Sequence, residues 1–499
     1  MKSVPDQSLP IFKIDRADPV PLHKQIYEGY RAAILRGDLR AGGQILSSRE
    51  FAAELRVSRF PVLNAYAQLI AEGYLESRVG AGTFVSASLP EQQMSVPPPS
   101  GRSIAAPSGP RPVSHRSTLY PRLNISAVHR GWGSFGVHQP ALDQFPFNIW
   151  SGLVARHSRN PHVRAIHLID PRGAERFRTA ICDYLRTARG VKCTPEQVLI
   201  VSGSQQALDI TARVLLDPGN PVWVEEPGYS LQRIVLTAAG CRLIPVPVDG
   251  DGMDVAAGIK RAPKARAAFV TPSHQYPLGS TMSASRRIQL LNWAHSAGAW
   301  VIEDDYDSEF RYESLPISSM HGLDQNARVI YIGTFSKVLF PSLRLGYIVM
   351  PPDLVDRFVA VRHAMDIFPP YLHQEVMSDF ILEGHFTRHI RKMRQVYKER
   401  RSILIESLAR EFPADQGYEI HGVEAGMHLA MTLPTDLAPT ITDAEISARA
   451  AASRLWLWPL SPSYTTVPPR RGFILGFGSS LPSQIPKAVR LMHSLISSL

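Results

Sequence analysis

From about residue 170 onward, short apolar runs alternate with amphipathic segments. The spacing of apolar residues predicts helices over 173–185 and 286–297. Strand-length apolar runs stand between such helical segments, at 198–201, 222–224, 243–246, 267–270, 299–303 and 329–332. Apolar strands that alternate with helices predict a largely parallel sheet with helices on both faces. The fold class of this part is therefore α/β.

The first 90 residues have a different pattern, made of short amphipathic segments. Helices are predicted over 21–35, 47–55 and 59–72. Ser47 and Ser58 stand before the second and third helices, where a serine side chain can cap the free N–H groups. Two short strands follow, joined through Gly80 and Gly82. Two helices separated by a short turn, followed by a strand pair, predict a winged helix-turn-helix.

A proline-rich stretch separates the two patterns. Residues 90–121 contain eight prolines mixed with Ser, Gly and Gln. This composition cannot bury enough apolar surface to fold and favours an extended spacer. The chain is therefore predicted to hold a small module over 1–88, a linker over 89–130 and a large domain over 131–499.

Bulk composition narrows the cellular setting. The chain has 499 residues, and its longest apolar runs fall far short of a membrane span. Its N-terminus lacks the apolar core of a signal peptide. The three cysteines are an odd number without metal-ligand spacing. A cytoplasmic protein that does not enter a membrane is expected.

Charge alone is a weak argument for nucleic acid. The formal net charge is +10, but residues 1–90 hold 11 basic and nine acidic side chains. The excess is spread along the chain, so the helix pattern rather than the charge has to support DNA binding.

Two residues at the ends of apolar runs carry the chemistry. Lys337 follows the run that begins at 329, and Asp304 ends the run that begins at 299. Ligands of parallel sheets bind at the carboxyl ends of the strands. A lysine and an aspartate there suit pyridoxal 5'-phosphate (PLP), since the amine forms a Schiff base and the carboxylate keeps the ring nitrogen protonated. Asp305 is the rival for the aspartate role.

The N-terminal residues resemble the GntR-type winged helix-turn-helix. The resemblance rests on Pro21-Leu-x-x-Gln-Ile, Ser47-Ser-Arg49, Val57-Ser-Arg59, Ala71-Glu-Gly-Tyr-Leu75 and Gly80-x-Gly-Thr-Phe-Val85. It implies that the third helix enters the major groove of a double-stranded DNA operator and that the wing lies near the minor groove. The DNA contacts it implies are Ser47, Ser48, Arg49, Ser58, Arg59, Arg78, Gly80 and Gly82.

From about residue 131 the chain resembles fold-type I PLP enzymes of the aminotransferase superfamily. The matching motifs are Val201-Ser-Gly-Ser-Gln-Gln-Ala-Leu208, Glu226-Pro-Gly-Tyr229, Thr334-Phe-Ser-Lys337 and Pro341-Ser-Leu-Arg-Leu-Gly346. The resemblance implies that Lys337 forms the Schiff base, that Tyr229 lies against the ring and that Tyr306 bonds the phenolic oxygen. The phosphate ligands it implies are Ser204, Gln205, Thr334, Ser336 and Arg344.

The segment Thr271-Pro-Ser-His-Gln-Tyr-Pro-Leu-Gly279, together with Glu303-Asp-Asp-Tyr-Asp-Ser-Glu309, is typical of the MocR branch of GntR regulators. His274 is either a contact of the ring substituents or a structural histidine. Leu168 stands where family members commonly have a tyrosine that reaches the partner's phosphate, which argues against efficient transamination. Arg471, or less well Arg470, matches the arginine that clamps a ligand carboxylate, and the alternative is an exposed arginine.

The resemblance implies a PLP-dependent transcriptional regulator that senses a small amino compound or PLP itself, as a homodimer. The alternative is an active aminotransferase of the aminoadipate type with an accessory DNA-binding head. In a third interpretation the PLP fold has lost its cofactor and serves only for dimerisation, which the complete set of site residues disfavours.

Overall fold

The structure is a computed structural model. It describes residues 13–90, 111–121, 133–159, 170–312, 317–437, 440–465 and 469–498. These residues fall into two compact units, divided after Pro112. The predicted domain boundaries stay predictions, because much of the linker lies outside the described residues. One helix, α5 (His115–Thr118), forms within the predicted linker.

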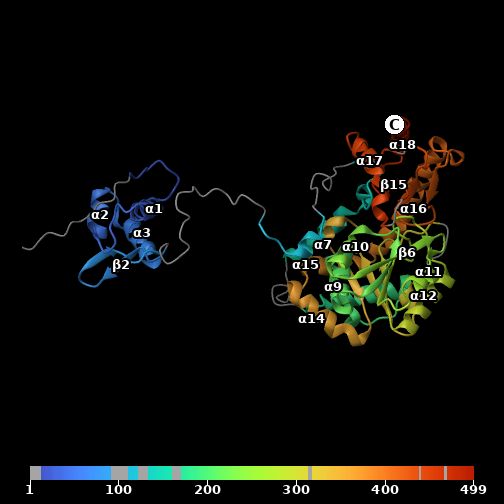
Figure 1. The fold of residues 1–499 in the computed structure, drawn as a ribbon, viewed down its shortest axis with the longest axis horizontal. Coiled ribbons are helices and arrows are strands. Elements are labelled where there is room, and N and C mark those ends of the chain that lie inside the picture. The colour runs from blue at the N-terminus through green and yellow to red at the C-terminus, as the bar shows by residue number, and fades with distance from the viewer. Residues whose placement is uncertain are drawn as a thin grey trace, which may run out of the picture. The chain divides into compact units, whose positions relative to one another are not determined.

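The smaller unit is a winged helix-turn-helix, as predicted (Figure 1). It contains α1 (Leu22–Leu35), β1 (Gln44–Ile45), α2 (Ser48–Glu54), α3 (Arg59–Ala71), β2 (Leu75–Arg78) and β3 (Gly82–Val85). β3 pairs antiparallel with both β1 and β2. The sequence did not predict β1. The core of the smaller unit includes Tyr30, which packs edge-on against Phe51 at 5.0 Å and shares a 2.7 Å hydrogen bond with the hydroxyl of Tyr66.

The larger unit is built on an eight-stranded mixed sheet in the order β4-β11-β10-β9-β8-β5-β6-β7. The strands are β4 (Val198–Val201), β5 (Pro221–Glu226), β6 (Arg242–Asp249), β7 (Gly252–Met253), β8 (Ala267–Val270), β9 (Trp300–Asp305), β10 (Val329–Thr334) and β11 (Gly346–Val349). Strands β6, β5, β8, β9 and β10 are mutually parallel. The antiparallel strand β11 was not predicted, and it separates β10 from β4.

Helices cover both faces of this sheet. They are α7 (Phe147–Arg159), α8 (Glu175–Arg189), α9 (Ser204–Leu215), α10 (Ser230–Ala238), α11 (Val255–Arg261), α12 (Ala284–Ala297), α13 (Met320–Leu323), α14 (Val355–Asp366) and α15 (Leu372–Leu382). Alternate residues of β9 belong to different cores: Ile302 packs with residues of α9, and Val301 with residues of α12. The central strands are thus apolar on both faces, as a sheet between two helical layers requires.

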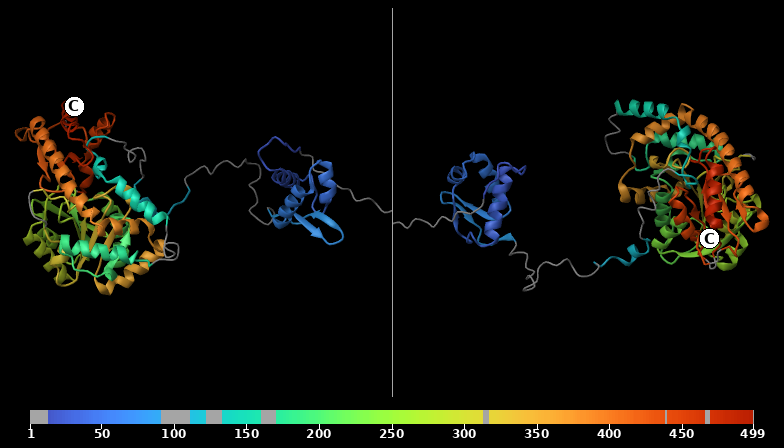
Figure 2. Two further views of the ribbon diagram at one scale, coloured as in Figure 1. Left: turned by 180° about the vertical axis from the view of Figure 1, so that it is seen from behind. Right: turned by 90° about the horizontal axis from the view of Figure 1, so that it is seen from above.

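A second, antiparallel sheet follows the long helix α16 (His385–Glu411). Its order is β12-β13-β15-β14, formed by β12 (Glu419–His421), β13 (His428–Thr432), β14 (Trp458–Pro459) and β15 (Gly472–Gly476). Helices α17 (Asp443–Ala451) and α18 (Ile485–Ser497) accompany it. Within the larger unit these orange and red elements gather beyond one end of the main sheet (Figures 1 and 2).

Among the described residues, no helix combines the length and the apolar character needed to cross a lipid bilayer.

Candidate functional site

A cavity opens at the carboxyl ends of the parallel strands, where the sequence placed Asp304 and Lys337. Asp304 is the second-last residue of β9, and Lys337 follows β10 in the loop that leads to β11. The described residues that line the cavity are His138, Ser204, Tyr229, Thr271, Tyr276, Asp304, Tyr306 and Lys337. Five of the residues predicted from the sequence therefore meet at one cavity.

The structure separates Asp304 from its rival Asp305. Successive side chains of a strand point to opposite faces. Asp305 pairs with Arg189 at 2.8 Å and accepts a 2.5 Å hydrogen bond from the hydroxyl of Tyr331. Asp304 lines the cavity and accepts no hydrogen bond from the described residues, and its Oδ1 is fully enclosed. Asp304 is therefore the carboxylate available to a ligand.

Burial brings the pKa values of Asp304 and Lys337 close to each other. Burial, reinforced by the charge of Asp305, raises the pKa of Asp304 to about 7. Burial also lowers the pKa of Lys337 to about 8, although Asp307 and Asp304 act in the opposite direction. A lysine with so low a pKa is partly unprotonated near neutral pH, which is the form that attacks a carbonyl carbon.

One end of the site has the features of an anion cradle. Ser204 begins α9, and Gly203 before it has φ +122° and no side chain to cap the free N–H groups. A Cβ on Gly203 would come within 3.2 Å of the Arg344 guanidinium, so the glycine lets that cation approach the helix end. The hydroxyl of Ser336 is buried and has no hydrogen-bond partner among the described residues. A helix N-terminus, a guanidinium and a free hydroxyl together suit a phosphate.

Two of the predicted phosphate ligands are engaged elsewhere. The Thr334 hydroxyl accepts the N–H of Ser336 at 3.2 Å, so it shapes the turn that carries Ser336 and Lys337. The Gln205 side chain donates to the carbonyl of Leu231 at 3.1 Å, which leaves its buried Oε1 without a partner. For these two residues the phosphate role stays a prediction.

Three tyrosines form the aromatic wall of the cavity, and a histidine lies behind one of them. Tyr229 precedes α10 and lies edge-on to Tyr276 at 5.6 Å. The hydroxyl of Tyr306 is 3.0 Å from Nδ1 of His274, which also lies 3.0 Å from the carboxylate of Asp307. His274 is not among the residues that line the cavity. It therefore sits behind Tyr306 and orients its hydroxyl, which favours the structural interpretation over direct contact with a cofactor ring.

Three glycines hold His274 in place. A Cβ on Gly426 would lie 1.9 Å from Cε1 of His274, and one on Gly279 would lie 2.4 Å from the Cα of Gly422. All three have positive φ, between +74° and +78°. The loop before β13 thus packs with its bare backbone against the segment that carries His274.

The guanidinium of Arg471 is engaged away from the cavity, and its role as a carboxylate clamp stays a prediction. Its guanidinium donates to the backbone carbonyls of Ile441 at 2.8 Å and Leu437 at 2.6 Å. Arg471 has the same parity along β15 as Phe473, whereas Ile474, on the opposite face, clusters with the cavity tyrosines. Arg470 is also engaged elsewhere, with Glu419. Leu168, the other residue that bore on ligand handling, lies outside the described residues.

Sequence reasoning missed three residues that line the cavity. Thr271 donates its hydroxyl to Glu225 at 2.7 Å, and burial raises the pKa of that carboxyl to about 7. Tyr276 stacks on His138 at 5.5 Å with an interplanar angle of 27°. Tyr276 was inside a quoted motif, so its aromatic character was a usable signal. Nothing in the local sequence marked His138.

The residues of this site fit PLP. Lys337 would hold the cofactor covalently, Asp304 would face its ring nitrogen, and Ser204, Ser336 and Arg344 would hold its phosphate. The enclosed and unpartnered oxygens of Asp304 and Ser336 support the fit, because buried polar atoms normally have partners. When bound, PLP supplies an electron sink for amines attached to it.

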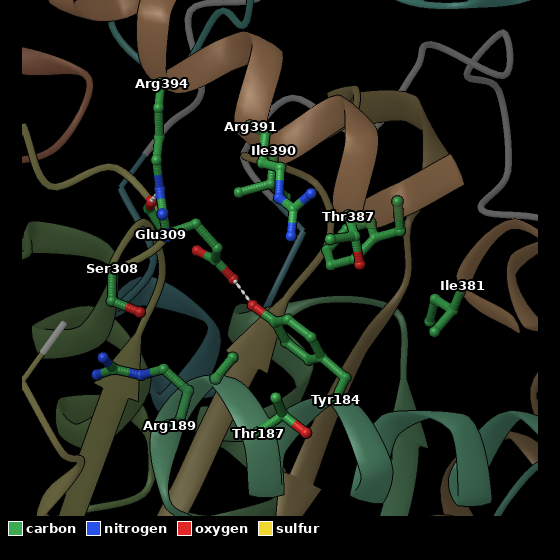
Figure 3. A pocket seen from close by; sticks show the side chains of 12 residues that line it. Tyr184, Thr187, Arg189, Ser308, Glu309, Ile381, Thr387, Ile390, Arg391 and Arg394 are labelled. Carbon is green, nitrogen blue, oxygen red and sulfur yellow. Dashed lines mark hydrogen bonds between the residues drawn. The ribbon is translucent and has the colours of Figure 1, made fainter. Parts of the chain in front are cut away.

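A second cavity lies between α8, α16 and the loop after β9 (Figure 3). At its centre the hydroxyl of Tyr184 donates to the carboxylate of Glu309 at 2.7 Å. Burial raises the pKa of Glu309 to about 7. Arg394, from α16, donates to the backbone carbonyl of Glu309 at 2.6 Å. In this cavity the buried carboxylate of Glu309 has a hydrogen-bond partner, whereas Asp304 has none among the described residues.

In the smaller unit, part of the predicted DNA-contact set serves the fold itself. Ser47 forms a reciprocal capping box with Glu50 at the start of α2. Ser48 accepts a 3.1 Å hydrogen bond from Arg59. Ser58 occupies the N-cap position of α3, but its side chain makes no cap hydrogen bond. Arg49 is exposed and is thus available to a ligand.

The wing is a tight hairpin between β2 and β3. Arg78 pairs with Gly82 in register and packs over the ring of Phe84 at 4.6 Å. Gly80 and Gly82 have φ of +75° and +108°, a region that residues with side chains rarely adopt. The sequence missed Phe60, which is 71% exposed at the start of α3 beside Arg59.

The larger unit has the sheet of a fold-type I aminotransferase with a buried lysine and aspartate, and the same chain has a winged helix-turn-helix. Together these features define the class of regulators with an aminotransferase-like domain. Residues 22–85 match the family model for bacterial regulatory proteins of the gntR family. Residues 164–458 match that for aminotransferase class I and II. The chain belongs to the MocR-type branch of the GntR family.

Three relatives align along most of their length. The probable rhizopine catabolism regulatory protein MocR of Rhizobium meliloti is 40% identical, over 96% of this chain and 95% of the relative. The pyridoxine biosynthesis regulator PdxR of Corynebacterium glutamicum is 30% identical over 93% of each chain. The regulator TauR of Rhodobacter capsulatus is 30% identical over 94% of each chain.

Two solved aminotransferases resemble the larger unit. Kynurenine aminotransferase of Pyrococcus horikoshii, in complex with PMP, is 26% identical with a TM-score of 0.70. The α-aminoadipate aminotransferase LysN of Thermus thermophilus, complexed with N-(5'-phosphopyridoxyl)-L-leucine, is 26% identical with a TM-score of 0.71. Each covers 77% of this chain, which covers 97% of each of them.

Proposed function

We propose that this chain is a homodimeric, PLP-holding transcriptional regulator whose aminotransferase-like domain senses an amino compound or PLP. The observation that carries the proposal is the meeting of Lys337 and Asp304 at one buried cavity, in a chain with a winged helix-turn-helix. Both groups titrate near neutral pH, so both protonation states needed to capture an amine are accessible.

The chain's own residues account for the binding steps. With PLP bound, the amine of Lys337 would hold the cofactor covalently and would give up that place to an amine ligand. Asp304 holds a proton at the ring nitrogen, and Tyr306, oriented by His274, presents its hydroxyl to the cavity. A ligand changes the regulator only through different affinities for two conformations of the protein.

The DNA-binding half of the proposal rests on α3 and the wing. Recognition helices of this motif place their N-terminal residues against base edges. In this chain that end carries Arg59 and the exposed Phe60, and aromatic side chains can contact the methyl group of thymine. Arg49 and Arg78 would contact the DNA backbone.

The test combines optical and DNA-binding measurements on the full chain. Absorption spectra with PLP, before and after borohydride, report whether the cofactor is held by a lysine. An operator is selected from random duplexes, and its affinity is measured with and without PLP. The proposal expects a reducible visible band and an operator affinity that changes with PLP or with an added amine. A band without sequence-selective DNA binding would contradict the regulatory role.

Arg59→Ala tests the DNA contact directly. Loss of a base contact should weaken operator binding by about 1–3 kcal/mol and relax the preferred sequence. Arg213→Ala is the matched control, because that exposed arginine lies on α9 of the other unit, where it pairs with Asp209. Equal operator affinity of both variants would remove α3 from the proposed interface.

An active aminotransferase is the second candidate. The presence of Lys337, Asp304 and Tyr306 in one cavity favours it, since these groups suffice for transfer of an amino group to PLP. Incubation with amino compounds and detection of the ketone or aldehyde product by mass spectrometry separates the two functions. Many turnovers per chain would identify an enzyme.

A further inference from the structure

Among the described residues, no arginine lines the amine side of the cavity to bind a carboxylate. Strand β15 passes this side and presents Ile474, which belongs to a buried cluster with Tyr276, Tyr306 and Leu460. Gly472 and Gly476, two residues away on either side, have the same parity and carry no side chain. The strand therefore turns only apolar or absent side chains towards the cavity tyrosines.

The two arginines that precede β15 are committed elsewhere. Arg471 donates to backbone carbonyls between 434 and 441, and Arg470 pairs with Glu419. Redirecting Arg471 to the cavity would leave those carbonyls without their donor and would move the guanidinium through the sheet. The parity of β15 therefore turns Arg471 away from the amine side, and the ion pair with Glu419 engages Arg470.

The remaining wall supplies little positive charge. Of the described residues that line the cavity, Lys337 is the sole amine, and a ligand that displaces it from the cofactor releases it as an amine whose pKa burial lowers to about 8. Arg344 lies at Gly203, on the phosphate side. Burial and the nearby charge of Lys337 hold the pKa of His138 well below its ordinary value, so this imidazole is uncharged near neutral pH. Among the described lining residues a buried carboxylate would find no guanidinium to pair with, and burying a carboxylate without such a partner is costly.

We infer that the ligand sensed at this site is a primary amine that carries no carboxylate on the carbon bearing the nitrogen. This inference rests on the proposed function and specifies the chemical class of its effector. The rings of Tyr229 and Tyr276, with Ile474 packed against Tyr276 from β15, receive an apolar body, and the His138 imidazole offers a hydrogen bond to a hydroxyl group.

The test compares amines with the matching amino acids on the PLP-loaded full chain. The pairs are tyramine and L-tyrosine, 2-aminoethanol and L-serine, and 1,5-diaminopentane and L-lysine. Dissociation constants come from the change of the visible band, and melting temperature is an independent readout. In at least one pair the amine should bind about tenfold tighter or better, because the carboxylate of its partner is buried without a donor.

Amino acids that bind as tightly as their amines in every pair, or tighter, would overturn the inference. A visible band that none of the six compounds shifts would also overturn it and would leave the cofactor site intact. Failure of the proposed function looks different, because no visible band would then form with PLP at all.

Ile474→Arg sharpens the test, with Ile474→Leu as the matched control. The arginine adds a cation on the face of β15 that packs against the cavity tyrosines. It should strengthen the binding of amino acids relative to amines by about tenfold, whereas leucine should leave the ratio of dissociation constants unchanged. If the arginine variant does not fold, the comparison of ligands on the parent chain still decides. A folded Ile474→Arg variant with an unchanged ratio would show that this strand does not set the selectivity.

Discussion

Two neighbouring carboxylates of β9 have opposite surroundings. Asp305 is bound by Arg189 of α8 and by Tyr331 of β10. Asp304 faces the cavity, accepts no hydrogen bond from the described residues and lies near Lys337. Both are buried. A buried carboxylate whose partners are present contributes to the fold, and one without partners indicates space for a ligand. The following variants test that distinction.

The largest effect is expected from Lys337→Ala. The variant removes the amine that faces Asp304, so the cavity can no longer hold PLP covalently. The reducible visible band should disappear completely, while the melting temperature of the cofactor-free protein stays close to that of the parent. Lys192→Ala is the control, since that lysine is exposed in the same unit. A persistent, borohydride-sensitive band would assign the Schiff base to another lysine.

Asp305→Ala should affect stability more than binding. It leaves Arg189 buried without its partner, and removing one member of a buried ion pair costs about 3–5 kcal/mol. Denaturant unfolding monitored by the fluorescence of the larger unit measures this loss. Whatever protein stays folded should still show the visible band with PLP. A stable variant without the band would exchange the roles of the two aspartates.

Asp304→Ala should have the opposite profile. Loss of the charge at the ring nitrogen should weaken PLP binding by about 2 kcal/mol, or roughly 30-fold. Because burial raises the pKa of Asp304 to about 7, the folded domain loses stability as the pH rises from the ordinary carboxyl value through 7. The variant escapes that loss, so without cofactor it should melt no lower than the parent at about pH 8. Melting well below the parent would give Asp304 a structural role.

The rate of cofactor capture should follow the pKa of Lys337. With a pKa of about 8, the unprotonated amine increases about tenfold per pH unit below 8 and levels off above it. A lysine with its ordinary pKa would keep accelerating beyond about pH 10. The growth of the visible band after mixing with PLP measures the rate, and N-α-acetyl-lysine corrects for titration of PLP itself. A continued increase above about pH 9 would contradict the lowered pKa.

Tyr184→Phe should have the smallest effect. It removes the hydrogen bond to Glu309 in the second cavity, which is worth about 1 kcal/mol to stability. PLP affinity should not change, because the second cavity is separate from the residues around Lys337. Tyr229→Phe is the matched variant in the first cavity. A loss of PLP affinity in Tyr184→Phe comparable to that in Asp304→Ala would show that the two cavities are coupled.

Apolar patterning predicted much of this structure. Lys337 and Asp304 were found because each follows an apolar run, and the carboxyl ends of parallel strands converge. The same continuity hid the choice between Asp304 and Asp305, since a strand buried on both faces has no polar alternation to set its parity. The direction in which Arg471 points could not be predicted for the same reason. Phe473, Ile474 and Leu475 are all apolar, so the side of β15 that faces the cavity is decided by pairing with β13.

The close contacts of Gly279, Gly422 and Gly426 have a mechanical consequence. The backbones of Gly279 and Gly422 are in close contact, and His274 is enclosed beside Gly426, so these segments are tightly packed. A shift of the loop before β13 by a few tenths of an ångström would press on the imidazole, and through it on the hydroxyl of Tyr306. The packing of the loop before β13 thus fixes where His274 lies and, through it, where the hydroxyl of Tyr306 lies in the cavity wall.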